Sequence, residues 1–291
     1  MRKTRALLVA VLLSLGPFVP LAMAQGTYTQ VDFPGALATY AFDIDSAGDV
    51  VGYYQDASQN SHGFLLSGGT FSTIEEPNSD TSYAFGINDN GQIVGAHRIV
   101  GGSIFYGFVY DVATGAFTDF SYPESHFTLA TAINNAGVVV GYASVPNGSR
   151  FIGFELNGGT FLTIQPHAIG SVSVNGINDS GDVVGYVFPH PPASSFVFNI
   201  TYHRILGSVE GAQAYGINNA NAISGTYFPG RIAEAGFVYD HGSLQELQFP
   251  AATTTLGFGI NDLGQVTGAF FDQSNAVHGF LWTPPADAAE K

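Results

Sequence analysis

The sequence predicts an all-β fold built from six similar units of four short strands. A strand–turn–strand motif centred on Ile-Asn-Asp-x-Gly recurs six times, at intervals of about 43 residues, which is the length of a four-stranded propeller blade. Each copy continues into an aromatic strand, and most copies add a Gly-containing turn and a β-rich run that ends in Pro. Together these observations predict a six-bladed β-propeller.

The first half of each unit is the strand–turn–strand motif. Asn-Asp-x-Gly between β-branched or aromatic runs is a hairpin signal, because Gly adopts positive φ at little cost. In the fifth copy Asn221 replaces the Gly, and Asn is the next best residue for that conformation. The copies span residues 42–52, 85–95, 131–141, 175–185, 215–225 and 258–268.

The second half of each unit supplies the core. Neighbouring blades cover both faces of a blade sheet, so its strands need not alternate apolar and polar residues. We expect Phe85 and Ile87 to face one way and Ala84 and Gly86 the other, so that adjacent blades interdigitate. The Gly that ends each second strand marks a close backbone approach or a bend. The core is also expected to hold the recurrent third-strand Phe residues: Phe64, Phe108, Phe154, Phe196, Phe237 and Phe280.

The two ends of the repeat region complement each other. Residues 25–34 are similar to a fourth strand but have no preceding strands, whereas the last copy stops at Trp282 without a fourth strand. Pairing the N-terminal strand with the last blade removes both edges and closes the ring. Repeats are therefore placed near residues 35–77, 78–123, 124–166, 167–206, 207–250 and 251–283, with 25–34 completing the last and a disordered tail at 284–291.

Residues 1–24 are typical of a signal peptide. Arg2, Lys3 and Arg5 precede an apolar run over residues 6–21, and a small-x-small cleavage site ends at Ala24. A membrane-spanning helix is the rival interpretation, but the run is short and is broken by Gly16-Pro17. We expect cleavage near Ala24 and a secreted protein, extracellular or periplasmic, with no transmembrane segment in the mature chain.

The chain is acidic and lacks cysteine. Its formal net charge is −15, so its surface repels phosphate backbones and nucleic-acid binding is not expected. With no Cys there is no disulfide framework. We expect a monomer.

The repeat resembles the HAF family of bacterial extracellular repeats. The resemblance rests on the pattern A-x-G-I-N-D-x-G-x-I-V-G over residues 84–95, followed by G-F-V-Y over residues 107–110, and on the parallel segments of the other copies. It extends over essentially the whole mature chain and implies a secreted or cell-envelope β-protein, but no catalytic residues. Departures include Asp43 and Asp45 in the first copy and Ser224 in the fifth.

One candidate metal site is the Asx residue that ends each innermost strand. Six such residues around one channel mouth would suit a hard cation such as Ca²⁺, the only cofactor that the sequence suggests. Alternatively each side chain caps its own turn, which we favour. A faint calcium-loop pattern from Asp43 to Asp49 lacks EF-hand spacing. The six residues are Asp45, Asn88, Asn134, Asn178, Asn218 and Asn261.

Candidate ligand-binding residues lie on the longer loops of the opposite face, because variable loops on a rigid scaffold usually carry function. Catalysis would require several polar loop residues to converge, yet the innermost strands begin with residues that do not ionise near neutral pH. The candidates are His97, Arg98, His126, Arg150, His190, Arg231 and Asp272.

The sequence favours a binding or scaffold module over an enzyme. Its variable-loop face would engage a polysaccharide, a peptide or an envelope protein. The alternative is an extracellular hydrolase or lyase with its site in the loop-face funnel, and a third possibility is a purely structural envelope component.

Overall fold

A computed structural model describes residues 26–145, 148, 150–165, 170–188, 194–199, 201–204, 211–228 and 234–286. The expected signal peptide and most of the expected tail lie outside these residues. Within the described part of the chain every regular element of more than one turn is a strand, and no helix has the length and hydropathy needed to cross a membrane.

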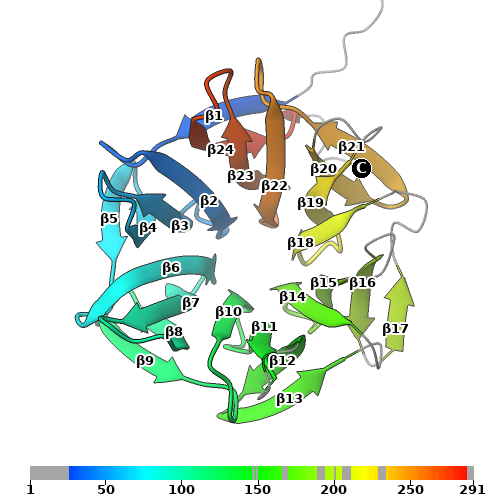
Figure 1. Ribbon diagram of the computed structural model, residues 1–291. Coiled ribbons are helices and arrows are strands. Elements are labelled where there is room, and N and C mark those ends of the chain that lie inside the picture. Colours follow the sequence, from blue (N-terminus) through cyan, green and yellow to red (C-terminus); the bar gives the residue numbers. More distant parts are fainter. Residues whose placement is uncertain are drawn as a thin grey trace, which may run out of the picture.

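The strands form antiparallel groups of four that are arranged around a central axis, as in a propeller (Figure 1). The first group contains β2 (Ala38–Ile44), β3 (Val50–Gln55), β4 (Ser61–Ser67) and β5 (Thr70–Ile74). The second contains β6 (Ser79–Ile87), β7 (Gln92–Ile99), β8 (Phe105–Asp111) and β9 (Ala116–Phe120). The third contains β10 (Thr128–Ile133), β11 (Val139–Ser144), β12 (Phe151–Asn157) and β13 (Thr160–Ile164).

The remaining groups follow the same order. The fourth contains β14 (Ser171–Ile177), β15 (Val183–Phe188), β16 (Ser194–Asn199) and β17 (Thr201–Arg204). The fifth contains β18 (Gln213–Ile217), β19 (Ile223–Tyr227), β20 (Ala235–Asp240) and β21 (Ser243–Leu247). The last contains β22 (Thr254–Ile260), β23 (Val266–Phe271), β24 (Val277–Thr283) and the N-terminal strand β1 (Thr27–Val31).

The predicted pairing of the N-terminal strand with the last copy is present. β1 runs antiparallel to β24, with Thr27 opposite Thr283 and Val31 opposite Gly279. A single parallel bridge between Ala38 and Val277 also joins the first and last groups into one sheet. Val31 of β1 is buried and Tyr28 packs against the apolar cluster that contains Trp282, so β1 joins the core of the last group.

The repeated residues occupy the positions that packing requires. All six third-strand Phe residues are fully buried, as predicted. A Cβ on Gly95 would lie 1.8 Å from the carbonyl oxygen of Tyr83 and 2.8 Å from the Phe108 ring, so only Gly fits there. Asn221 has a φ of 64°, which is the left-handed conformation expected where Asn replaces the turn Gly.

Each innermost strand carries a register shift that the sequence did not predict. In β6 the shift falls between Ala84 and Gly86, so Phe85 is an extra residue without a partner on β7. A bulge of this kind turns the extra side chain away from the regular alternation. The expectation that Phe85 packs between blades is therefore wrong, because the bulge directs it to the central axis. Corresponding shifts occur in β2, β10, β14, β18 and β22.

Candidate functional site

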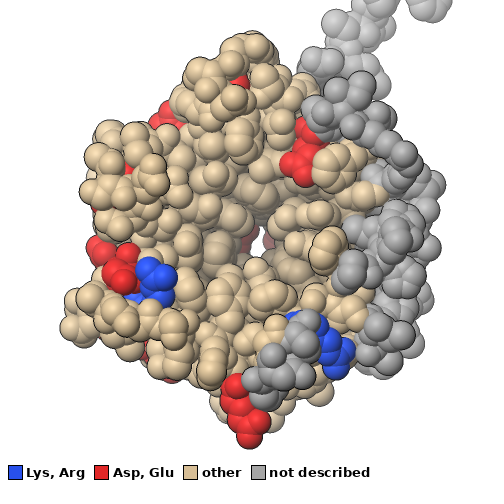
Figure 2. Space-filling view, in the orientation of Figure 1, with Lys and Arg blue, Asp and Glu red and all other residues tan. Residues whose placement is uncertain are grey.

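A cavity of about 510 Å³ lies on the central axis. It is on the side where the innermost strands begin, which is also the side of the longer connections, since Tyr83, Leu129 and Ser173 line it. Figure 2 shows a hollow at the centre of this face, surrounded mostly by residues other than Lys, Arg, Asp and Glu. The bulge positions of all six innermost strands contribute to its wall: Phe42, Phe85, Thr131, Asn175, Tyr215 and Phe258.

One wall of the cavity is aromatic. Phe42 stacks on Phe258 with ring centres 4.5 Å apart and an angle of 1° between the planes. Phe85 meets Phe42 edge-on at 5.0 Å, and Tyr215 meets Phe258 edge-on at 5.3 Å. Four consecutive units therefore present one continuous arc of aromatic rings.

The opposite wall is polar. The Ser173 hydroxyl donates to Asn175 Oδ1 at 2.6 Å, and Asn175 Nδ2 donates to the carbonyl oxygen of Ala214 at 2.8 Å. Thr131 Oγ1 donates to the carbonyl oxygen of Val174 at 2.7 Å. These bonds fix the side chains, and the amide of Asn175 keeps one N–H and one lone pair for a ligand.

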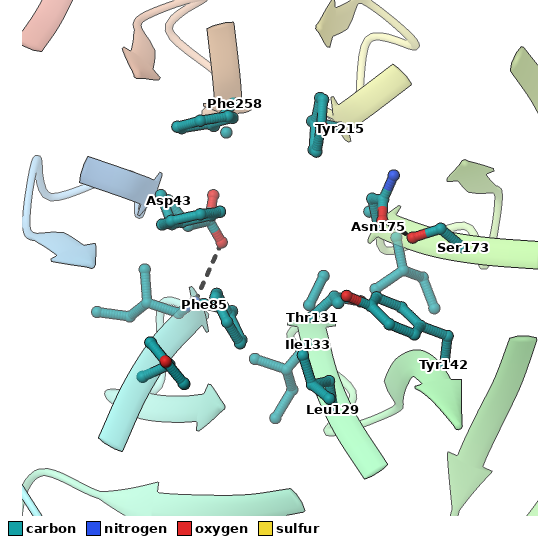
Figure 3. A pocket seen from close by; sticks show the side chains of 18 of the residues that line it. Asp43, Phe85, Leu129, Thr131, Ile133, Tyr142, Ser173, Asn175, Tyr215 and Phe258 are labelled. Carbon is teal, nitrogen blue, oxygen red and sulfur yellow. Dashed lines mark hydrogen bonds between the residues drawn. The ribbon is translucent and has the colours of Figure 1, made fainter. Parts of the chain in front are cut away.

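Asp43 adds a carboxyl group to the aromatic side of the cavity. Figure 3 shows it across the cavity from Asn175. Its Oδ2 accepts the backbone N–H of Ile87 at 3.1 Å. Burial raises the pKa of this carboxyl from its ordinary value to about 7, although hydrogen bonds from the backbone N–H groups of Ile87 and Ile44 oppose the shift; the nearby charge of Asp45 adds to it.

Gly259 of the last unit packs directly against Asp43. A Cβ at Gly259 would lie 2.3 Å from Asp43 Oδ1, but also 2.7 Å from the Asp43 Cα and 2.8 Å from the carbonyl oxygen of Phe42, so the close backbone approach by itself requires Gly. The other copies carry only Gly or Ala at the position of Asp43, namely Gly86, Ala132, Gly176, Gly216 and Gly259. Sequence reasoning noted Asp43 as a departure from the repeat and as the start of a faint calcium-loop pattern, and it did not compare Asp43 with the equivalent Gly and Ala residues, although this contrast was the signal for the site.

Tyrosine hydroxyls around the cavity remain protonated. Burial raises the pKa of Tyr53, Tyr142 and Tyr215 above the ordinary value for a phenol. Among the described residues of the lining, Asp43 alone therefore ionises near neutral pH. The cavity combines one carboxyl group with neutral donors and aromatic rings.

A layer of isoleucines lies around the axis between this cavity and a small hollow of about 70 Å³ at the other end. The Asx residues line that second hollow. Asn88 Oδ1 accepts the N–H groups of Asn90 and Gln92 at 3.1 and 3.0 Å, so it caps its own turn as we favoured. The isoleucines are Ile44, Ile87, Ile133, Ile177, Ile217 and Ile260.

The Asx side chains also link neighbouring units, which the sequence did not reveal. Asn88 Nδ2 donates to the carbonyl oxygen of Asn134 at 3.0 Å. The same bond continues from Asn134 to Asn178, Asn218, Asn261 and finally the carbonyl oxygen of Asp45. Asp45 has no side-chain N–H, so it cannot donate the sixth bond to Asn88.

The next residue of each turn takes part in a second series of hydrogen bonds between neighbouring units, which runs from Ser46 to Asp262. Asn219 Nδ2 donates to carboxylate oxygens of Asp179 and Asp262 at 2.9 and 2.8 Å, so an amide separates two acids. Asn135 bridges Asp89 and Asp179 in the same way. Among the described residues no group of three or more His, Cys, Asp or Glu has the arrangement of a metal site.

The predicted loop-face residues do not line the cavity. His97 is fully buried, with its Nε2 3.1 Å from a carboxylate oxygen of Asp119. Arg98 pairs with Asp80 at 2.9 Å and lies over the ring of Phe105. Both side chains are therefore engaged within the second unit.

The other predicted loop-face residues are also separate from the cavity. His126 is exposed, and its carbonyl oxygen accepts the N–H of Phe105. Arg150 is half-buried, and Asp272 accepts the N–H groups of Ser274 and Ala276 within its own loop. None of the five described candidates belongs to the cavity lining. His190 and Arg231 lie outside the described residues.

Comparisons with known proteins support the fold and leave the function open. A family described as a protein of unknown function (DUF3466) matches residues 54–151. No curated protein sequence matches the chain. The solved structures to which it is similar include the β-propeller domain of the Trilobed protease from Pyrococcus furiosus, at 12% identity and a TM-score of 0.55 over 86% of this chain and 94% of that one.

Two further similar structures are a streptogramin B lyase and the lectin of Aleuria aurantia. The lyase is 12% identical, with a TM-score of 0.52 over 88% of this chain and 97% of the other. The lectin is 12% identical, with a TM-score of 0.53 over 86% and 97%. Identities this low show the fold alone, which is all-β and propeller-like.

Proposed function

We propose that this protein is an exported six-bladed β-propeller that binds a small ligand in its central cavity. The β1–β24 pairing supports ring closure, and the basic and apolar N-terminal segment supports export through a signal peptide. In this proposal the ligand enters from the face that carries the longer connections.

The observation that carries the proposal is the pair of unlike walls around the cavity. Ligand sites are concave and largely apolar, with a few placed polar groups, and hold about 300–1,000 Å³. The cavity of about 510 Å³ meets this description, with Phe42 and Phe258 on one side and Ser173 and Asn175 on the other. A central channel belongs to the propeller architecture itself, so the difference between the two walls, and not the open space, carries the proposal.

The walls suit a ligand with a ring-shaped apolar face and a polar edge. A sugar unit of a polysaccharide has this form, since its C–H face packs on aromatic rings and its hydroxyls bond amides and hydroxyls. The similar lectin from Aleuria aurantia was solved with a fucose-containing disaccharide. The sequence had suggested the loop rim as the binding surface, and the proposal moves the ligand to the axis.

A cavity-filling variant tests the proposal. Thr131→Phe places in the third unit the residue that three other units carry at the same position (Phe42, Phe85 and Phe258). The variant should fold, and it should no longer capture the ligands that the wild-type protein captures on a glycan array or from envelope extracts. Leu162→Ala on the outermost strand β13 is the control, because Leu162 is 57% exposed. Equal capture by wild type and Thr131→Phe would reject the cavity as the site.

Catalysis by a lyase is the second candidate, and Asp43 is the observation that favours it. A carboxyl group with a pKa of about 7 suits proton transfer near neutral pH. Hydrolysis of a glycosidic bond by two carboxyl groups has less support, because the described lining holds one carboxyl. Mass spectrometry of captured ligands after incubation would detect cleavage. If the wild-type protein leaves them unchanged, the lyase hypothesis is rejected and binding remains the proposed function.

A further inference from the structure

The charged residues along the central axis limit the classes of ligand that the cavity can bind. The described lining of the cavity includes Asp43 but no Lys, Arg or His. The hollow beyond the isoleucine layer adds Asp45, Asp89, Asp179 and Asp262, again without a described basic residue. Low-dielectric walls lined by charges of one sign concentrate the potential along such a channel. The axis is therefore negative from one end to the other.

Asp43 is built into the wall at a structural cost. Its carboxyl group is removed from bulk water, which disfavours its charged form. Five other units fill the same position with Gly or Ala, so the fold does not need a carboxyl there. A carboxylate has about four lone-pair positions, and the backbone N–H groups of Ile87 and Ile44 use two of them. The remaining ones can accept bonds from a ligand.

The neighbours of Asp43 favour a cation over a neutral group. The adjacent wall is the aromatic arc that includes Phe42, Phe85 and Phe258. Aromatic rings attract cations within about 6 Å, most strongly when water is excluded. An ammonium group would thus meet a counter-ion and aromatic rings together, while a carboxylate or phosphate ligand would meet repulsion.

We propose that the ligand carries an ammonium group, on a sugar or aromatic ring, which binds Asp43 while the ring spans the cavity toward Asn175. An amino sugar and an arylalkylamine both have this chemistry. The inference rests on the proposed function, because it assigns the charge of the ligand in the same cavity.

Binding of such a ligand should be linked to the ionisation of Asp43. The carboxyl must be ionised to act as a counter-ion, and its pKa is about 7, whereas an alkylammonium keeps its proton to about pH 9 or above. Affinity should therefore rise as the pH increases from 5.5 to 8.5. The groups packed against Asp43 from β6 and β22, Ile87 and Gly259, do not titrate, and Asp45 on its own strand is the nearest described acid.

Calorimetry with matched probes tests the inference on the mature protein. The pairs are 2-phenylethylamine with 2-phenylethanol, and 6-amino-6-deoxyglucose with glucose. At pH 8 the amine of each pair should bind about tenfold or more tightly than its neutral partner. At pH 5.5 its affinity should be about tenfold or more weaker than at pH 8. Asp43→Asn should remove both effects and leave the binding of the alcohol or the neutral sugar unchanged. Asp111→Asn, at the end of β8 and outside the lining of both hollows, is the matched control and should behave as wild type.

The outcomes separate this inference from the proposed function. If each amine and its neutral partner bind equally, or if Asp43→Asn keeps the preference for the amine, the charge assignment is overturned while binding in the cavity stands. If Thr131→Phe binds every probe as tightly as wild type, the cavity is not the site and both proposals fail.

Discussion

The two ends of the central axis are built from the same repeat but differ in how much their equivalent residues vary. At the turn end the Asx residue is Asn in five units and Asp in one, and its side chain is tied to its own turn and to the next unit. At the cavity end the bulge residue is Phe, Thr, Asn or Tyr, and it faces open space. The contrast shows that uniform positions hold the ring together, whereas variable positions shape what the ring can bind.

Deleting residues 25–34 should have the largest effect on both ends. The deletion removes β1, which leaves β24 as an unpaired edge and exposes Trp282. We expect a loss of about 5 kcal/mol in the free energy of unfolding and a fall of about 10–20 °C in melting temperature. Removal of residues 287–291 is the control and should change neither. A deletion variant as stable as its parent would refute ring closure by β1.

Asp43→Asn should stabilise the protein at high pH. The pKa of Asp43 is raised to about 7 in the folded protein, so the folded state retains a proton that the unfolded state releases between about pH 4 and 7. The wild-type carboxyl therefore lowers stability as the pH rises through this window. The variant should be more stable than wild type by about 4 kcal/mol at pH 8 and nearly equal at pH 4. Urea titrations at both pH values measure the difference in the free energy of unfolding between variant and wild type. A difference that does not depend on pH would contradict the raised pKa of Asp43.

A pair of Asn→Ala variants compares the two ends directly. Asn134→Ala leaves two backbone N–H groups of its own turn and the carbonyl oxygen of Asn178 without their partners. We expect it to lower the free energy of unfolding by about 2–3 kcal/mol. Asn175→Ala at the bulge faces the cavity, so its loss should be about 1 kcal/mol or less. Equal losses in urea unfolding would remove the distinction between the two ends.

Asp45→Asn should give the smallest effect, a gain in stability. An amide at this position supplies the missing donor toward the carbonyl oxygen of Asn88. Burial also raises the pKa of Asp45, so its charged form is disfavoured in the fold. We expect a gain of about 1 kcal/mol at pH 7, read from the midpoint of chemical unfolding. A loss of stability would show that the carboxylate has a role that an amide cannot replace.

Much of the fold could be predicted because each unit repeats the same local chemistry. The turn Asn and Gly residues, the buried third-strand Phe and the unmatched strand at residues 27–31 all have direct sequence signals. The bulges do not, because a single extra residue in a strand is visible only against its partner strand. For this reason Phe85 was assigned to blade packing although it lines the cavity.

The candidate site was harder to predict because its residues are unremarkable one by one. Asp43 was noted as a departure from the repeat, but its place in the cavity wall is set by neighbours from distant parts of the chain, such as Gly259, which is 216 residues away. The loop-face residues His97 and Arg98 drew attention as polar side chains, yet His97 is buried next to Asp119 and Arg98 pairs with Asp80, both within the second unit. Comparison of equivalent positions across the copies was more informative than residue type.

A crystal structure of the mature protein grown with 2-phenylethylamine at pH 8 would test the central claim most directly. The account predicts electron density for the ring between the aromatic arc and Asn175, with the ammonium group within hydrogen-bond distance of Asp43. Density for the amine only at the loop rim, near Arg98 or Asp272, with an empty central cavity would contradict it.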